Sequence, residues 1–109
     1  MKQIYFDRAS RSIADLVELD PAYYLVTRIN VPRESRNRGL GTKILTEILS
    51  DADMEGVTLE IHPMSSGGLS RAQLITWYKR HGFRWEQDYY SHDPVKVLVR
   101  KPGGNAFHE

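Results

Sequence analysis

The sequence predicts a single α/β domain of the α+β kind, in which helices flank a mixed sheet. Two strand-like segments, Tyr23 to Val31 and Val57 to His62, enclose one helical segment, which is the order of a βαβ crossover with parallel strands. A second helical segment and two more strand-like segments follow, so an antiparallel hairpin is expected to make the sheet mixed. The chain has 109 residues, enough for one hydrophobic core.

The N-terminal part is expected to contain one strand and one helix. KQIYF (Lys2 to Phe6) predicts a short strand. Within Arg11 to Leu19, Ile13, Leu16 and Val17 recur at helical spacing, and Pro21 follows. This pattern predicts a short helix over Arg11 to Leu19.

The central segment contains the predicted crossover. Tyr23 to Val31 is rich in β-branched and aromatic residues, which indicates a buried strand. From Leu40 an apolar stripe at helical spacing predicts a core-facing helix that ends at Gly56. The next segment, Val57 to His62, alternates and is expected to be a strand with Thr58, Glu60 and His62 on its second face.

The C-terminal part begins with a helix signal. Ser70 and Gln73 form the S-x-x-Q pattern of a capping box, and Gly82 stands where a C-terminal glycine of that helix belongs. Strands are predicted near Phe83 to Tyr90 and over Val95 to Lys101. Pro and paired glycines follow, so we expect one domain over 1–101 and a flexible tail over 102–109.

Composition excludes several classes of function. The chain has no cysteine, which excludes disulfides, thiolate metal sites and a cysteine nucleophile. Its four histidines lack metal-ligand spacing, so we expect no metal. The formal net charge is +1, and no binding motif for nucleic acid is present, so we expect no such partner. Neither a signal-peptide run nor a membrane-spanning segment is found, which makes a cytoplasmic location the expectation.

The stretch RNRGLGTK, which begins the first predicted core helix, is suited to binding an anion. Unpaired helix N-terminal amides, two glycines and nearby cationic side chains suit a phosphate or pyrophosphate. A glycine-containing turn with solvated arginines is the alternative. The Walker pattern of phosphate-binding loops, G-x-x-x-x-G-K-[ST], is absent. The dinucleotide pattern fits at Gly39 and Gly41 but has Ile44 at its third position, although Glu60 lies near where a ribose-binding acid would stand.

Two ordered motifs resemble those of the GNAT superfamily of N-acetyltransferases. Arg36 to Gly41 matches [QR]-x-x-G-x-[GA], the coenzyme A loop of that family, and LSRAQLITWYKRHGF ends in -Y-x-x-x-GF with Tyr78, Gly82 and Phe83 in register. The resemblance implies a GNAT-like acyl-CoA N-acyltransferase fold. It also implies transfer of the acetyl group of acetyl-CoA, by direct attack of a primary amine.

The resemblance also implies a set of cofactor-binding residues. One strand backbone is expected to pair with the pantetheine arm and the following loop to bind the pyrophosphate, and Ser70 is a further predicted cofactor-binding residue. A backbone N–H near Val31 is the expected donor to the thioester carbonyl. The predicted residues are Ile29, Asn30, Val31, Arg36, Asn37, Arg38, Gly39, Leu40, Gly41, Thr42 and Ser70.

Three residues are the predicted catalytic groups. Tyr78 matches the family's tyrosine acid, which donates to the departing sulfur, although its position on an apolar stripe also suits a core residue. The strand Tyr23 to Val31 has no acidic residue, where some family members carry a glutamate base. Glu60 and His62 are therefore the candidate bases, with a solvated Glu60 or a water-relayed base as alternatives.

The acceptor and partners follow from the short segment that precedes the loop. A short segment there leaves the acceptor side open, which favours a protein lysine or N-terminus as the amine. Alternatively a homodimer completes the site, with Trp77, Trp85, Tyr89 and Tyr90 as interface material. Two other functions compete with the enzyme: a CoA-binding or protein-interaction module with little catalysis, and a truncated dinucleotide-binding fold.

Overall fold

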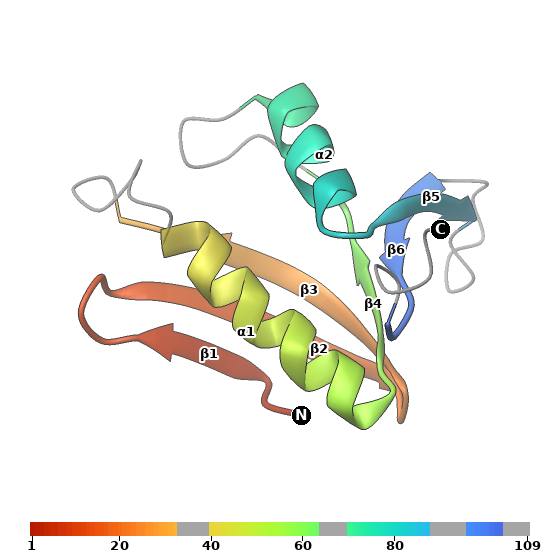
Figure 1. The fold of residues 1–109 in the computed structure, drawn as a ribbon, viewed down its shortest axis with the longest axis horizontal. Helices are drawn as coiled ribbons and strands as arrows, with labels where there is room; N and C mark the ends of the chain where they lie inside the picture. The colour runs from red at the N-terminus through yellow and green to blue at the C-terminus, as the bar shows by residue number, and fades with distance from the viewer. Residues whose placement is uncertain (33–39, 64–69, 88–95, 104–109) are drawn as a thin grey trace.

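A computed structural model describes residues 1–32, 40–63, 70–87 and 96–103, with the side chains of Leu40, Gln87 and Lys96 excepted (Figure 1). Within these ranges the chain forms a sheet and two helices. In chain order the elements are β1 (Ile4–Asp7), β2 (Ser12–Asp20), β3 (Tyr23–Asn30), α1 (Leu40–Glu55), β4 (Thr58–Ile61), α2 (Arg71–Arg80), β5 (Arg84–Gln87) and β6 (Lys96–Arg100).

The sheet is mixed, as the sequence predicts. Its six strands follow the order β1-β2-β3-β4-β6-β5. Strands β3 and β4 pair in parallel around α1, and each of the other neighbouring pairs is antiparallel. The predicted βαβ crossover and the C-terminal hairpin are therefore confirmed. The predicted strand residues between Gln87 and Lys96, and the tail beyond Gly103, lie outside the described residues.

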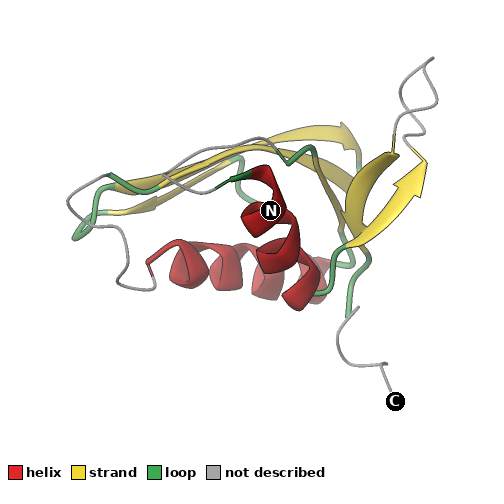
Figure 2. Cartoon of the chain, turned by 90° about the horizontal axis from the view of Figure 1, so that it is seen from above, coloured by secondary structure: helices red, strands yellow, loops and turns green. Residues whose placement is uncertain are grey.

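Both helices lie on the same side of the sheet, as Figure 2 shows. Residues that stand opposite each other in neighbouring strands share a face, so the pairing of Tyr5 with Ala14 and of Tyr24 with Leu59 places all four on one face. All four are buried in one apolar cluster with α1 residues such as Ile48. The core thus fills the space between this face and the helices, and we call the opposite side of the sheet the helix-free face.

The predicted helix over Arg11 to Leu19 is wrong, because the segment is strand β2. Its burial alternates at the start, with Ser12, Ala14 and Leu16 buried, which is the period of a strand. Arg11 has φ 62° and donates its N–H to the Asp7 carbonyl at 2.7 Å, which closes a tight turn after β1. Pairing with strands on both sides therefore overrides the helical spacing of the apolar residues.

Both helices end in a Schellman motif, which confirms the two predicted glycine stops. Gly56 has φ 69°, and the next N–H, of Val57, donates to Ala52 O at 2.8 Å. Helix α2 begins with the predicted capping box of Ser70 and Gln73. At its other end Gly82 has φ 97° and its N–H donates to Lys79 O. These local signals determine where each helix ends and set the direction in which the chain enters the following strand.

A buried arginine fastens the last strand to both helices. Arg100 is 3% exposed and donates from Nη1 and Nη2 to the two carboxylate oxygens of Asp53 on α1, at 2.8 and 3.0 Å. Its Nε donates to the His81 carbonyl at the end of α2. The bonds from Arg100 and from the Gly103 N–H lower the pKa of Asp53 below its ordinary value.

Candidate active site

Strands β3 and β4 separate part way along their length. Their parallel pairing ends at Val26 and Ile61, while β3 continues to Asn30 beside β2. At the same place Thr27 is an extra residue, because Leu16 stands opposite Val26 and Asp15 stands opposite Arg28. Such a bulge bends the strand and increases its twist. The edge of β3 after Val26 therefore turns away from β4 and opens a gap in the sheet.

A cleft of about 220 Å³ occupies this gap. Its walls come from the separated ends of β3 and β4 and from the inner side of α2, and they include residues from both faces of the sheet. The cleft thus lies between the helix side and the helix-free face. Its lining residues are Val26, Thr27, Arg28, Ile29, Asn30, Ile61, His62, Pro63, Leu74 and Tyr78.

Tyr78 forms the α2 side of the cleft. Its side chain is buried, and burial raises the pKa of Tyr78 to about 12. The ring packs against Phe83 with centroids 5.4 Å apart and against Trp77 at 5.0 Å. No residue in the described ranges hydrogen-bonds to the Tyr78 hydroxyl, yet no buried side-chain oxygen there lacks a partner. The hydroxyl is therefore open to the cleft, so the ring belongs to the core while its polar end can act on a ligand.

Glu60 and His62 face the helix-free side at the end of β4. Glu60 is 2% exposed, and both of its oxygens are bonded: Tyr23 Oη donates to Oε1 at 2.6 Å, and His62 Nε2 lies 2.6 Å from Oε2. Glu60 and Leu59 lie on opposite faces of β4, as the predicted alternation requires, and the alternative of a solvated Glu60 is wrong. His62 is about half exposed and lines the cleft, so the buried carboxylate holds the imidazole at the opening.

The predicted cofactor residues are only partly described. Ile29 and Asn30 line the cleft. The loop residues Arg36, Asn37, Arg38 and Gly39 lie outside the described residues, as does the side chain of Leu40, the first residue of α1. Ser70 caps α2, where its Oγ accepts from the Gln73 N–H at 3.2 Å, and it does not line the cleft.

The first turn of α1 packs closely against α2. A Cβ added at Gly41 would lie 3.6 Å from Val31 Cγ2 and 3.7 Å from Trp77 Cη2, so the small residue leaves room for ordinary contact on both sides. Trp77 Nε1 donates to Thr42 Oγ1 at 3.3 Å. These contacts bring Val31, Gly41 and Thr42 together beside α2, and their predicted role in cofactor binding stays a prediction.

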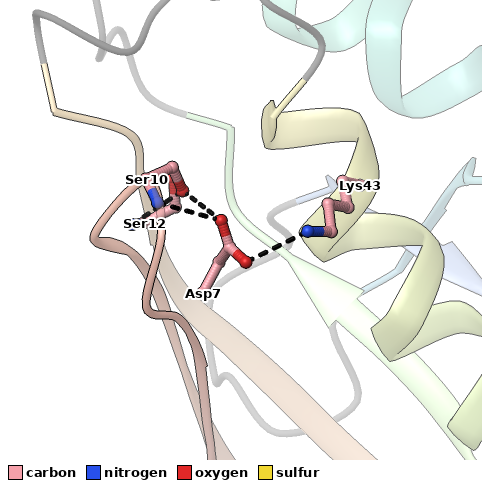
Figure 3. Close-up of polar contacts among 4 residues, drawn as sticks. All are labelled: Asp7, Ser10, Ser12 and Lys43. Atoms are coloured by element: carbon pink, nitrogen blue, oxygen red, sulfur yellow. Dashed lines mark hydrogen bonds and ion pairs between the residues drawn. The ribbon is translucent and has the colours of Figure 1, made fainter.

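The same turn of α1 is also bonded to the β1–β2 hairpin (Figure 3). Lys43 Nζ donates to Asp7 Oδ1 at 3.1 Å, and Ser10 donates to Asp7 Oδ2 from its N–H at 3.1 Å and its Oγ at 2.5 Å. Ser10 and Ser12 share a further hydroxyl bond at 2.7 Å. The bonds from Ser10 and Lys43 lower the pKa of Asp7. Lys43, which lies one turn into α1, is thereby held at the hairpin.

No group of three or more His, Cys, Asp or Glu side chains in the ranges that the structure describes could hold a metal ion. None of the helices described is long and apolar enough to cross a membrane.

Sequence reasoning missed the groups that support the cleft. Tyr23 was assigned only to a buried strand, and its bond to Glu60 joins residues far apart in the chain. The bulge at Thr27 leaves no mark in the residue pattern. The signal available was Glu60 itself, a lone carboxylate between two apolar residues on a short strand, which needs a bonded partner when it is buried.

No family model and no curated protein sequence matches the chain. Solved structures do match. The ribosomal-protein-S18-alanine N-acetyltransferase from Escherichia coli superposes with a TM-score of 0.61 and 22% identity, over 83% of this chain and 60% of that one. A GNAT family acetyltransferase from Elizabethkingia anophelis with acetyl-CoA bound gives 0.60 and 18%, over 83% and 67%. The anti-CRISPR protein AcrVA5 gives 0.62 and 16%, over 90% and 98%.

These likenesses show the fold. The chain has the mixed-sheet fold of GNAT N-acetyltransferases, so the predicted fold and the resemblance on which it rested are confirmed at that level. The chain spans less than two thirds of the length of the Escherichia coli enzyme and of four other solved structures that it matches.

Proposed function

We propose that this chain is an acetyl-CoA-dependent N-acetyltransferase that acetylates a primary amine by direct attack. The observation that carries the proposal is the cleft between β3 and β4, which has both Tyr78 and His62 in its lining. The fold supports the same assignment, since a solved GNAT acetyltransferase of this fold has acetyl-CoA bound.

The described residues fit acetyl-CoA, which would supply the reactive thioester. From Thr27 to Asn30 the edge of β3 runs along the cleft with no pairing to β4, so its backbone groups can bond an amide-containing arm. At the start of α1, the amides near Gly41 and Thr42 suit a pyrophosphate. The cofactor would thus run from the helix side into the gap in the sheet.

The reaction assigns one task to each side of the cleft. The amine nitrogen attacks the thioester carbonyl carbon, and a C–N bond forms as the C–S bond breaks. The proton lost by the amine passes to His62, directly or through a water, and Tyr78 donates to the departing sulfur. A Tyr78 pKa of about 12 keeps the phenol protonated at neutral pH, so the donor is present throughout the working range.

Glu60 and Tyr23 position the proposed base. Glu60 Oε2 lies 2.6 Å from His62 Nε2, within hydrogen-bond distance, so the carboxylate fixes the position of the imidazole. The imidazole that Glu60 holds in this way is the proposed proton acceptor. The Tyr23 hydroxyl occupies the other carboxylate oxygen and keeps the Glu60 side chain in this orientation. This arrangement supports the choice of His62 as base over Glu60, which is enclosed.

Thiol release from acetyl-CoA tests the proposed function. Wild-type protein is incubated with small amines and lysine peptides, and mass spectrometry confirms the amide product. The Tyr78→Phe variant is expected to release thiol about 100-fold more slowly, while CoA still raises its melting temperature. Equal rates for the two proteins would show that Tyr78 is not the acid. Absence of any acetylated product would contradict the proposed acetyltransferase activity.

A CoA-binding module is the second candidate. The residues of β3, YYLVTRIN, include no acid that could act as a base, which is the observation in its favour. Stabilisation by CoA without product from any amine would select this candidate. Stabilisation by NAD instead of CoA would select the dinucleotide-binding alternative.

A further inference from the structure

We infer that the helix-free face of β1, β2 and β3 is a docking surface for a polypeptide acceptor. The acceptor would place an apolar side chain on this face about three residues from its reactive amine. This inference rests on the proposed function and names the class of acceptor that the site would take.

Large apolar side chains are exposed together on this face. Ile4 is 60% exposed, Phe6 57% and Val17 45%. Among the residues described, four large hydrophobic side chains are exposed, and the fourth, Met54, lies on α1. The register places the three on one face. Ile4 stands opposite Asp15, and Phe6 stands opposite Ile13. Val17 lies an even number of residues after these two β2 residues, so its side chain points to the same face.

Rows of paired residues connect these side chains to the cleft. Phe6 stands opposite Ile13, which stands opposite Asn30, and Asn30 lines the cleft. A second row leads from Val17 through Leu25 to Glu60, which holds His62. Neighbouring strands are about 4.8 Å apart, so β1 lies about 10 Å from β3, and about three residues of extended chain span that distance.

The charged groups within this surface neutralise each other. Arg28 Nε donates to Asp15 Oδ2 at 2.7 Å, and Arg28 Nη2 lies 2.6 Å from the same oxygen. The pair stands between Ile4 and the cleft. A surface of apolar side chains around an internally paired charge has no excess of either sign, so it fits an apolar segment rather than an acidic or basic one.

The size of the surface favours a peptide segment over a second copy of the chain. Three strands cover a width of about 10 Å, and Ile13 to Val17 covers a length of about 13 Å. A stable protein dimer buries about 800 Å² of each partner, more than three partly exposed apolar side chains supply. A short segment of an acceptor that also enters the cleft needs much less area.

Two synthetic peptides and one triple variant test the inference. Both peptides carry one lysine; one has leucine three positions before and after it, and the other has serine there. Affinities are measured by calorimetry on CoA-saturated protein. Wild type is expected to bind the leucine peptide at least about tenfold more tightly. In a variant with Ile4→Thr, Phe6→Thr and Val17→Thr, which keeps strand-forming residues, the two affinities should become equal. Met54→Ser, on the other side of the sheet, should keep the preference.

The outcomes separate this inference from the proposed function. Equal affinity of wild type for the two peptides, or a preference that survives the triple variant, overturns the docking surface. The docking surface is also overturned if wild type sediments as a dimer and the triple variant as a monomer, because a second copy then covers the face. Thiol release by wild type with n-butylamine reports on the proposed function alone, since that amine has no flanking side chain.

Discussion

Phe83 donates its backbone N–H to the carbonyl of Tyr78 at 3.2 Å, and the rings of the two residues pack edge to face. The bond is the longer of the two that close the Schellman motif, and the ring contact is the apolar contact that accompanies such motifs. One pair of residues therefore ends α2 and holds the phenol at the cleft. The Y-x-x-x-GF signature has a structural meaning as well as a proposed chemical one.

Phe83→Leu is expected to weaken both the fold and the proposed activity. The leucine keeps the backbone bond but loses the aromatic contact and part of the buried volume. The free energy of unfolding should fall by about 1 kcal/mol, as measured by urea denaturation. Thiol release should fall more than this loss of stability explains, because the Tyr78 ring is less firmly held. A variant with reduced stability and wild-type kcat would show that the pair serves the fold alone.

Tyr78→Phe should separate stability from activity. The Tyr78 hydroxyl is open to the cleft and bonds to no described residue, so its removal leaves no partner unpaired. We expect the free energy of unfolding to change by less than about 1 kcal/mol while kcat falls about 100-fold. Trp77→Phe, which removes the bond to Thr42 at the start of α1, is the matched control and should affect CoA affinity more than kcat.

Changes at the three bonded residues Tyr23, Glu60 and His62 should have graded effects. His62→Gln is expected to lower kcat about 100-fold, because the proposed proton acceptor is removed. Glu60→Gln should lower kcat less, because His62 keeps a hydrogen-bonding neighbour, while binding of CoA is retained. Tyr23→Phe leaves the buried carboxylate with one bond fewer, which should cost about 1–3 kcal/mol of stability. An unchanged kcat in all three variants would assign the base to another group.

Asp53 should contribute to stability only above acidic pH. Its folded pKa lies below the ordinary value of 3.8, so the ionised form favours folding above that value, and the contribution is lost as the pH falls through the folded pKa. At neutral pH, Asp53→Asn should reduce the free energy of unfolding by about 1–3 kcal/mol, since Arg100 stays buried with a weaker partner.

Urea denaturation at neutral pH and near pH 3 checks this expectation. The difference between wild type and Asp53→Asn should be large at neutral pH and should narrow on acidification. The matched control is Glu47→Gln. Glu47 makes an exposed pair with Lys2 at 3.4 Å, which should contribute less than about 1 kcal/mol. A difference that stays constant with pH would mean that the Asp53 carboxylate is not the source of the stability.

The fold after Tyr23 was predictable because its signals are local. The capping box at Ser70 and the glycines at Gly56 and Gly82 act within a few residues, and the structure uses each of them at the predicted place. The alternation of β4 likewise follows from neighbours in the chain. Such signals do not depend on which element packs against the segment, so they can be read from the sequence alone.

Strand β2 was not predictable from its own residues. The spacing of Ile13, Leu16 and Val17 suits a helix, but Leu16 faces the core while Val17 is 45% exposed on the opposite face. The assignment depends on β1 and β3, which pair with β2 on either side. Information of this kind is held in the register between strands, and a single segment does not contain it.

The candidate site was predictable in part. Tyr78, His62, Ile29 and Asn30 were each named from motif or strand position, and the structure brings them to one cleft. The burial of Glu60 depends on Tyr23 and on the β-sheet around it, which the pattern of β4 alone does not show. The roles assigned to these residues stay predictions, as does the role of the loop from Arg36 to Gly39.

The first turn of α1 is held from two directions, by Asp7 on Lys43 and by Trp77 on Thr42. These supports come from the N-terminal hairpin and from α2, so the place proposed for the pyrophosphate is linked to both. A ligand that binds to this turn stabilises the folded state. Local opening of the N-terminal hairpin and of α2 should then become less frequent. Amide hydrogen exchange in β1, β2 and α2 should therefore slow when CoA is added, although none of their backbone amides needs to touch it.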